Sequence, residues 1–247
     1  MHHFIKQLEW TLKTCIMKQK LNNILAISIG ILPFNIIMVW YRLTQTDEFS
    51  TVDMLAYPLI FGCGVILLIL FLNKYLLKQK LRDFNPGNGK WHWDILVGLV
   101  LTAFYFMLMS IEQVTIARLL PQGKPPSQEV ITLMIELANN PLLLTIWLGP
   151  VVWIGVAVFE EIQRIFFMNC LWRLSNNKYW QIFTILIVAA VWGFMHLYQG
   201  TFGIISVSLQ GLVMGFYYYK FRRIWPLIIS HALFDSIQII MFVIQVS

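Results

Sequence analysis

Ionisable side chains occur inside apolar runs in the last third of this sequence, where a membrane-buried chain would ordinarily have none. They are Glu160, Glu161, Arg164, His196, His231 and Asp235. An ionisable side chain at the centre of a bilayer costs roughly 2.5–3.5 kcal/mol or more, so a cluster of this kind indicates a polar cavity with a function. Carboxylates and imidazoles are the groups that move protons and activate water in enzymes.

The adjacent residues Glu160 and Glu161 are the first part of this cluster. Neighbouring residues on a helix point about 100° apart, so only one carboxylate can be directed straight into a site. That carboxylate can serve as a general base or acid, and the other can orient it or anchor a neighbour. Arg164 follows them by four and three residues, so it can pair with either one on the same helix face. The alternative is a buried ion-pair anchor without a catalytic role.

The two histidines each have a partner one helical turn away. His196 follows Trp192 by four residues, so the indole and the imidazole share a helix face. A lone His near a helix end is more often structural or interfacial than catalytic. His231 precedes Asp235 by four residues, and an Asp that accepts from an imidazole N–H fixes its orientation. This pair can also donate to a developing oxyanion, or it can simply lock two helices together.

A metal site is an alternative use of the same residues. Glu160, His196 and His231 form a plausible zinc set, because two imidazoles with a carboxylate are common zinc ligands. The HExxH helix signature is absent, and the three cysteines include no close pair. No Gly-rich phosphate loop and no GxSxG sequence occurs either. We therefore expect no cofactor, with zinc as the alternative.

Membrane-spanning helices must position these residues. The 247 residues are 58% hydrophobic and only 12% charged, whereas soluble domains average about 25% charged residues. A helix needs about 20 mostly apolar residues to cross a bilayer. Such runs lie at residues 22–42, 54–76, 93–115, 142–172, 179–198, 202–219 and 224–245. The sequence therefore predicts an all-α polytopic transmembrane helix bundle of about seven spans.

Two breaks are expected around the fourth run. Residues 127–139 are typical of a short amphipathic or interfacial helix, which Asn139, Asn140 and Pro141 would end. The fourth run itself is too long for one straight crossing. Gly149 and Pro150 are expected to divide it, because Pro is tolerated in the first turn of a helix.

Most of the 18 Lys and Arg residues fall on one side of the predicted spans. They are Lys6, Lys13, Lys18, Lys20, Lys74, Lys78, Lys80, Arg82, Lys90, Arg173, Lys178, Lys220, Arg222 and Arg223. Cytoplasmic loops carry the excess of basic residues, so we expect a multi-pass cell-membrane protein with a cytoplasmic N-terminus and an outer C-terminus. The net charge of +6 is thus explained by topology, and no nucleic-acid partner is expected.

The depths of the polar residues set a condition on any shared site. At 1.5 Å per residue, Glu160 is expected near the middle of its span, and His196 near the outer end of the fifth. His231 is expected in the cytoplasmic half of the seventh span. A common site therefore requires tilted, kinked or re-entrant helices around a water-filled cavity.

Three segments together resemble the CPBP family of intramembrane proteases, also called the ABI or type II CAAX prenyl endopeptidase family. They are FEEIQR at 159–164, WGFMH at 192–196 and SHALFD at 230–235. The family has a Glu-Glu pair with a downstream Arg, an aromatic residue four before a His, and a His four before an Asn or Asp. The resemblance covers residues 150–240. It favours one integral membrane domain, 1–247, with N-terminal spans and an amphipathic connector at 1–140 and a CPBP-like catalytic core at 141–247.

The resemblance implies a hydrolase, a glutamate-type intramembrane endopeptidase of the CAAX-protease kind. Glu160 would be the general base, and His196 would hold and activate the water. His231 and Asp235 would stabilise the oxyanion. The supporting residues would be Glu161, Arg164 and Trp192. The implied partners are membrane lipid and a peptide or a prenylated or other membrane-protein substrate.

One departure from the family pattern favours a second interpretation. The family has three residues between the Glu pair and Arg, but only Ile162 and Gln163 intervene here, and Ile165 takes the usual Arg position. Arg164 is thereby moved by about 100° around the helix, although it still reaches Glu160 by the four-residue spacing. The alternative is a non-enzymatic immunity or peptide-binding membrane protein on the same scaffold. A proton-coupled transporter is a third reading, against which the lack of a repeated half counts.

Overall fold

A computed structural model describes residues 2–44, 55, 57–119 and 128–246. The described residues form helices and turns, with no strand among them. The α-helices are α1 (His2–Gly30), α2 (Leu32–Thr44), α4 (Gly62–Phe71), α5 (Trp91–Val114), α6 (Ile116–Leu119), α7 (Gln128–Asn139), α8 (Pro141–Ile146), α9 (Phe159–Trp172), α10 (Lys178–Met195), α11 (Gly200–Phe221) and α12 (Trp225–Val246). The π-helices are η1 (Tyr57–Phe61), η2 (Leu72–Leu76) and η4 (Trp147–Val158), and the 3₁₀-helices are η3 (Leu81–Phe84) and η5 (Leu197–Gln199).

Seven helical segments within this part of the chain are long and apolar enough to cross a membrane. They are Lys13–Ile37, Pro58–Leu76, Trp91–Val114, Pro141–Trp172, Lys178–Met195, Gly200–Phe221 and Trp225–Gln245. The predicted all-α, seven-span bundle is therefore confirmed. The predicted starts of the second span at 54 and of the connector at 127 lie outside the described residues.

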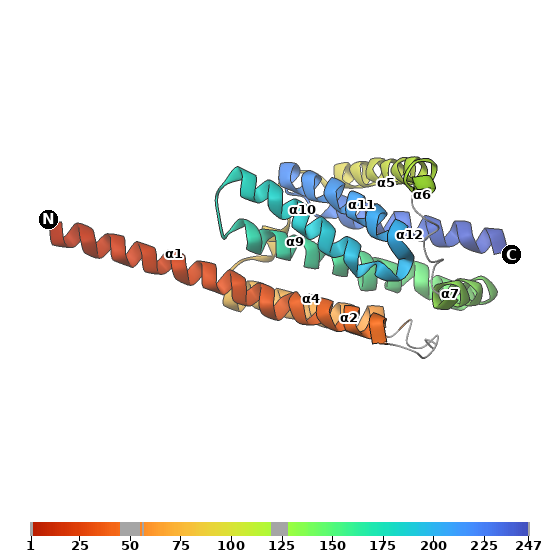
Figure 1. Ribbon diagram of the computed structural model, residues 1–247, viewed down its shortest axis with the longest axis horizontal. Coiled ribbons are helices and arrows are strands. Elements are labelled where there is room, and N and C mark those ends of the chain that lie inside the picture. The colour runs from red at the N-terminus through yellow and green to blue at the C-terminus, as the bar shows by residue number, and fades with distance from the viewer. Residues whose placement is uncertain (1, 45–54, 56, 120–127, 247) are drawn as a thin grey trace.

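The first span begins earlier in the chain than the sequence pattern predicted. The prediction was 22–42, whereas α1 runs from His2 to Gly30 and α2 resumes at Leu32. The Lys-, Gln- and Leu-rich segment before residue 22 is composed of good helix formers, so the helix continues through it. As a result, the N-terminal half of α1 projects well beyond the rest of the bundle (Figure 1).

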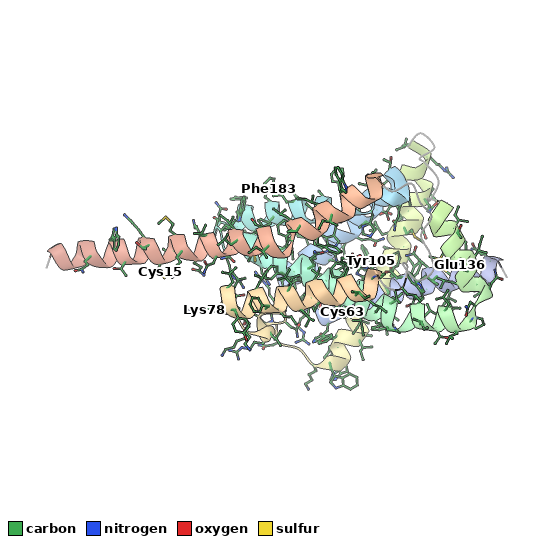
Figure 2. The ribbon with its side chains drawn as sticks, turned by 90° about the horizontal axis from the view of Figure 1, so that it is seen from below. Cys15, Cys63, Lys78, Tyr105, Glu136 and Phe183 are labelled. Carbon is green, nitrogen blue, oxygen red and sulfur yellow. The ribbon has the colours of Figure 1, made fainter. Side chains whose placement is uncertain are left out.

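The long helices lie side by side and alternate in direction, and the two termini lie at opposite ends of the bundle (Figure 1). An odd number of membrane crossings requires the two termini to lie on opposite sides. Helix α7 is seen nearly end-on in Figure 1, so it runs across the direction of the long helices. The view in Figure 2 shows its residue Glu136 at the end of the bundle away from the projecting half of α1.

The expected break between α7 and the fourth span is confirmed. Helix α7 ends at Asn139, and the side chain of Asn140 caps the next helix by accepting a hydrogen bond of 3.1 Å from the N–H of Leu143. Pro141 then occupies the first turn of α8, where a missing N–H costs nothing. The polar sequence NNP thus serves both helices, ending α7 and starting α8.

The predicted division of the fourth span at Gly149 is also confirmed. Gly149 has φ −90° and ψ −107°, outside the helical region, with Pro150 directly after it. The surrounding segment, η4, is a π-helix, which the sequence did not predict. Wide π-turns of this kind occur frequently next to functional sites, and this one leads directly into α9, which begins one residue before Glu160.

Small residues allow the C-terminal helices to pack closely. A Cβ atom on Gly193 of α10 would lie 1.9 Å from Oγ of Ser208 on α11, and one on Gly211 would lie 3.3 Å from Cα of Ala189. Helix α5 packs along α12 on another side of the bundle. These two helix pairs, together with α9, surround the polar residues of the C-terminal spans.

Candidate active site

The first turn of α9 carries the adjacent acids, and one of them is completely buried. Glu161 has no exposed surface, and Arg164 is only 2% exposed. Nη1 of Arg164 donates to Oε1 of Glu161 at 2.5 Å, and Nη2 lies 3.8 Å from Oε2 of Glu160. The shifted arginine therefore pairs with both carboxylates at the three- and four-residue spacings of one helix face.

His231 links this pair to the last helix. Its Nδ1 atom lies 2.9 Å from Oε1 of Glu161, and its Nε2 atom lies 3.4 Å from Oδ2 of Asp235. Both ring nitrogens thus face carboxylates, one on α9 and one on α12. A ring placed between two acceptors is held in orientation, because each nitrogen can donate only along its own direction.

His196 lies at the C-terminal end of α10, and its ring has a defined hydrogen bond. Nδ1 donates to the carbonyl oxygen of Trp192 at 2.8 Å, since a carbonyl oxygen can only accept. In the neutral ring this leaves Nε2 as the proton acceptor, the state that a water-activating imidazole needs. The sequence spacing of four residues therefore fixes the tautomer of His196 through the main chain.

Trp192 connects α10 to the charged cluster. Its ring is buried, and the guanidinium of Arg164 lies 5.3 Å from its centroid in a cation–π contact. Glu160 lies one turn before Arg164 on α9, and His196 lies one turn after Trp192 on α10. Because α9 and α10 run in opposite directions (Figure 1), Glu160 and His196 are displaced from the Arg164–Trp192 contact towards the same end of the bundle. His196 is thereby placed near the level of Glu160.

A shared site requires polar residues of different spans to lie at the same depth, and Glu161 and His231 do so. Glu161 and His231 are in hydrogen-bonding contact, so the middle of the fourth span and the N-terminal half of the seventh lie at one level. The kink at Gly149 makes the fourth span depart from a straight crossing. Ion pairs and hydrogen bonds thus join Glu160, Glu161, Arg164, His231 and Asp235 into one cluster.

The two acids of the pair differ in accessibility. The side chain of Glu160 is 17% exposed, whereas that of Glu161 is 0% exposed and occupied by Arg164 and His231. Only Glu160 can therefore be reached by a water or substrate without displacing another side chain. Glu161, expected as a supporting residue, makes the two shortest contacts of the cluster.

Tyr105 of α5 is a polar residue of this region that the sequence analysis missed. It is completely buried, it lies within electrostatic reach of Glu161 and Arg164, and its hydroxyl is close to that of Ser230. That hydroxyl makes no hydrogen bond of normal geometry with the described residues, and neither does Oε2 of Glu161. Ser230 donates its own proton to the carbonyl of Leu227. Figure 2 shows Tyr105 in the middle of the bundle.

A second buried acid lies outside the cluster. Glu112 near the end of α5 is 1% exposed, and Oγ of Ser206 on α11 donates to its Oε2 at 2.5 Å. This pair joins α5 to α11. It provides a membrane acid of the same type as Glu160 whose hydrogen-bond partner is a serine, which is useful as a comparison.

Glu160, His196 and His231, the alternative metal set, do not form a metal-binding group in the described part of the chain. Among the described residues, no three His, Cys, Asp or Glu side chains are grouped so that they could hold a metal ion. The cluster around Glu161 is instead held together by an arginine and by hydrogen bonds. Groups of these types can transfer protons and stabilise charge.

Comparison with known proteins gives one family match. Residues 141–237 match the protein-family model described as type II CAAX prenyl endopeptidase Rce1-like. No curated protein and no solved structure matches the chain. The matched segment runs from the start of α8 into α12 and includes every site residue predicted from the sequence, whereas Tyr105 lies outside it.

Proposed function

The chain belongs to the type II CAAX prenyl endopeptidase, or CPBP, family of membrane proteases through residues 141–237, and we propose that it is an intramembrane endopeptidase of the glutamate type. It is a multi-pass membrane protein, and its proposed reaction is hydrolysis of a peptide bond within or beside the membrane. The proposed substrate is a peptide or a prenylated or other membrane protein. The observation that carries the proposal is the cluster of three acids, an arginine and a histidine on α9 and α12, which is buried at Glu161 and Arg164 and partly exposed at Glu160, His231 and Asp235.

Glu160 is the proposed general base. It is the carboxylate of the pair that retains exposed surface, and the positive charge of Arg164 is 3.8 Å away. Glu160 would take a proton from water, and Nε2 of His196 would accept a hydrogen bond from the same water. The hydrogen bond from Nδ1 of His196 to the main chain supports this assignment, because it leaves Nε2 as the acceptor.

His231 is the proposed oxyanion donor. Its contact with Glu161 is 2.9 Å long and involves a carboxylate without exposed surface, whereas its contact with Asp235 is 3.4 Å long and involves a carboxylate that is 29% exposed. The longer contact is the weaker one, so the N–H of Nε2 is the donor that would give up Asp235 and pair with a developing oxyanion placed in its path. Glu161 would hold the ring in place during this step, and Asp235 would stabilise the charge on it.

The non-enzymatic alternative rested on the displaced arginine. Arg164 contacts both carboxylates in spite of its shorter spacing, and it packs on Trp192. These contacts support our assignment to Arg164 of the supporting role that the family pattern gives to an arginine. This favours the protease over an immunity or peptide-binding protein on the same scaffold.

A cleavage assay with matched variants tests the proposal. Purified protein in detergent is offered a panel of membrane-bound and prenylated peptides, with wild type, Glu160→Gln and Glu112→Gln compared. We expect Glu160→Gln to abolish cleavage and Glu112→Gln to retain it, because only Glu160 belongs to the cluster. Full activity of Glu160→Gln would contradict the mechanism.

The same assay tests metal independence and the binding-only alternative. We propose that no metal takes part, so cleavage is expected to survive a chelator. Cleavage that is lost on chelation and restored by zinc would indicate that Glu160, His196 and His231 are zinc ligands. Peptide binding without cleavage of any substrate, unaffected by Glu160→Gln, would favour the non-enzymatic protein.

The proposed orientation places the N-terminus in the cytoplasm and the C-terminus outside. Basic residues gather at the end of the bundle where α9 and α11 end and α10 begins, which supports that side as cytoplasmic. Single cysteines added at Lys178 and at Leu197, in a chain without its own cysteines, would test this with a membrane-impermeant thiol reagent. In intact cells we expect labelling only of the cysteine at position 197. Labelling only of the cysteine at position 178 would indicate the opposite topology.

A further inference from the structure

A polar cavity lies at one end of the bundle, apart from the cluster around Glu161. Its volume is about 340 Å³, which is within the usual range of ligand sites, about 300–1,000 Å³. The end of α9, the start of α10, the end of α11 and the loop after η3 form its walls. These elements meet at the end of the bundle from which α1 projects (Figure 1).

Arg173 is the first of two arginines that line this cavity. Its side chain is partly buried at the end of α9, directly after the predicted membrane span, and burial lowers the pKa of its guanidinium below the usual value. It makes no hydrogen bond or ion pair with any of the described residues; Asp83 is only within electrostatic reach. A partly desolvated guanidinium with five donors and no acceptor is costly in the absence of an anion.

Arg222 supplies a second guanidinium that is held in place. It ends α11 in the left-handed conformation, with φ 55° and ψ 34°, which is uncommon for a residue other than glycine. Its guanidinium lies 4.2 Å from the centroid of the Trp172 ring. This stacking holds the planar group at the cavity wall, next to Tyr218, and a guanidinium has five N–H donors, more than one such neighbour can use.

The remaining polar lining suits the same kind of ligand. Asn176 and Gln181 also line the cavity, and the N–H groups of side-chain amides can donate to anions. Asp83 contributes the one carboxylate, and its Oδ2 accepts from the N–H of Lys80. Two guanidinium groups against one carboxylate leave the lining positively charged.

We propose that this cavity binds a phosphate group, contributed by the headgroup of an anionic phospholipid. Guanidinium groups match phosphate oxygens in a forked geometry. Basic pockets between transmembrane helices on the cytoplasmic side are typical lipid-headgroup sites. The cavity lies where a span ends, at the depth at which headgroups are found. A free phosphate would offer the same chemistry, so the experiment separates the two sources.

Native mass spectrometry of the full-length protein in detergent tests the site. Phosphatidylglycerol and phosphatidylcholine with the same acyl chains are added in turn, and wild type is compared with Arg173→Gln. We expect phosphatidylglycerol to be retained in preference, and Arg173→Gln to reduce its retention about fivefold, the effect of one basic residue near a lipid surface. Arg173→Lys should show a smaller loss, since it keeps the charge without the fork.

Arg82→Gln is the matched control, because it removes the same charge from an exposed position at the same end of the bundle. An equal loss in Arg82→Gln and Arg173→Gln would overturn the proposal in favour of general surface charge. So would equal retention of both lipids by wild type and Arg173→Gln. Inorganic phosphate that raises the thermal midpoint only when Arg173 is present would support the site with a soluble phosphate as its ligand. None of these readouts depends on protease activity.

Discussion

The Nδ1 atom of His231 lies 2.9 Å from Oε1 of Glu161, and this contact joins α12 to α9. The same carboxylate oxygen accepts from Arg164 at 2.5 Å. Two motifs separated by about seventy residues in the chain therefore share one oxygen atom. The position of the imidazole is set by a carboxylate that itself has no exposed surface.

Replacing Glu161 by Gln is expected to destabilise the protein strongly. The variant removes the negative charge that Arg164 and His231 both contact. The buried guanidinium of Arg164 then has only the more distant Glu160 carboxylate to balance its charge. Breaking a buried ion pair by removing one partner costs about 3–5 kcal/mol. The measurement is the thermal midpoint of the purified protein in detergent.

Glu160→Gln is the control for this prediction. Glu160 is partly exposed, and its contact with Arg164 is 3.8 Å long, so a shift of about 1 kcal/mol or less is expected. Equal shifts for the two variants would mean that Glu161 does not organise the cluster. The pair of variants thus separates the structural acid from the proposed base.

Asp235 is expected to tolerate Asn better than Ala. The amide oxygen of Asn can still accept from Nε2 of His231, whereas Ala leaves that nitrogen without its helix partner. We expect Asp235→Ala to lower kcat by about 10²-fold, the scale of losing one oxyanion-stabilising group. Asp235→Asn should retain most of the activity in the same cleavage assay. Equal activity of the Ala and Asn variants would exclude Asp235 as the partner that orients His231.

Tyr105 is expected to be energetically coupled to Glu161. Its hydroxyl is buried near that carboxylate, and buried hydroxyls in native proteins are almost always hydrogen-bonded. The thermal midpoints of Tyr105→Phe, Glu161→Gln and the double variant form a double-mutant cycle. We expect a coupling of about 0.5–3 kcal/mol, as found for residues in one hydrogen-bond network.

Tyr75→Phe serves as the control for Tyr105, because Tyr75 is exposed on the second span. Its hydroxyl should show no coupling to Glu161. If the Tyr105 and Glu161 effects simply add, the phenol is only a packing residue. If Tyr105→Phe is more stable than wild type, the hydroxyl is a buried polar group without a compensating partner.

Gly193→Ala is expected to disrupt the packing of α10 on α11. The added methyl would lie 1.9 Å from Oγ of Ser208 and 2.6 Å from the carbonyl oxygen of Ile204, so the helices must separate. Overpacking of this kind costs about 1–3 kcal/mol. Since His196 follows three residues later, activity should fall together with the thermal midpoint. Gly64→Ala, where nothing lies within 4 Å, should be neutral or stabilising.

The sequence predicted the number and class of the helices because spans of apolar residues are a strong signal. It also located the break at Gly149 and the end of α7, where Gly, Pro and Asn change the backbone. It did not predict where α1 begins, because a helix can continue beyond the apolar residues that would contact lipid. The π-helix η4 was also missed, because a change from α- to π-turns leaves no distinct pattern in an apolar run.

The site was predicted in part. Pairs four residues apart, such as His231 and Asp235, share a helix face by geometry alone, and their contact could be expected. The contact between His231 and Glu161 depends on how two distant helices pack, which no local pattern encodes. Tyr105 was missed because a tyrosine in an apolar span resembles an ordinary packing residue. A polar atom in mid-span was its only signal.

The make-up of the buried cluster has a consequence for the substrate. Three carboxylates share a low-dielectric region with one guanidinium and one imidazole. When all three acids are ionised, even a protonated imidazole leaves excess negative charge there. A polypeptide with Asp or Glu next to its scissile bond would meet repulsion that the membrane interior barely screens. We therefore expect the proposed protease to disfavour substrates with acidic residues at those positions.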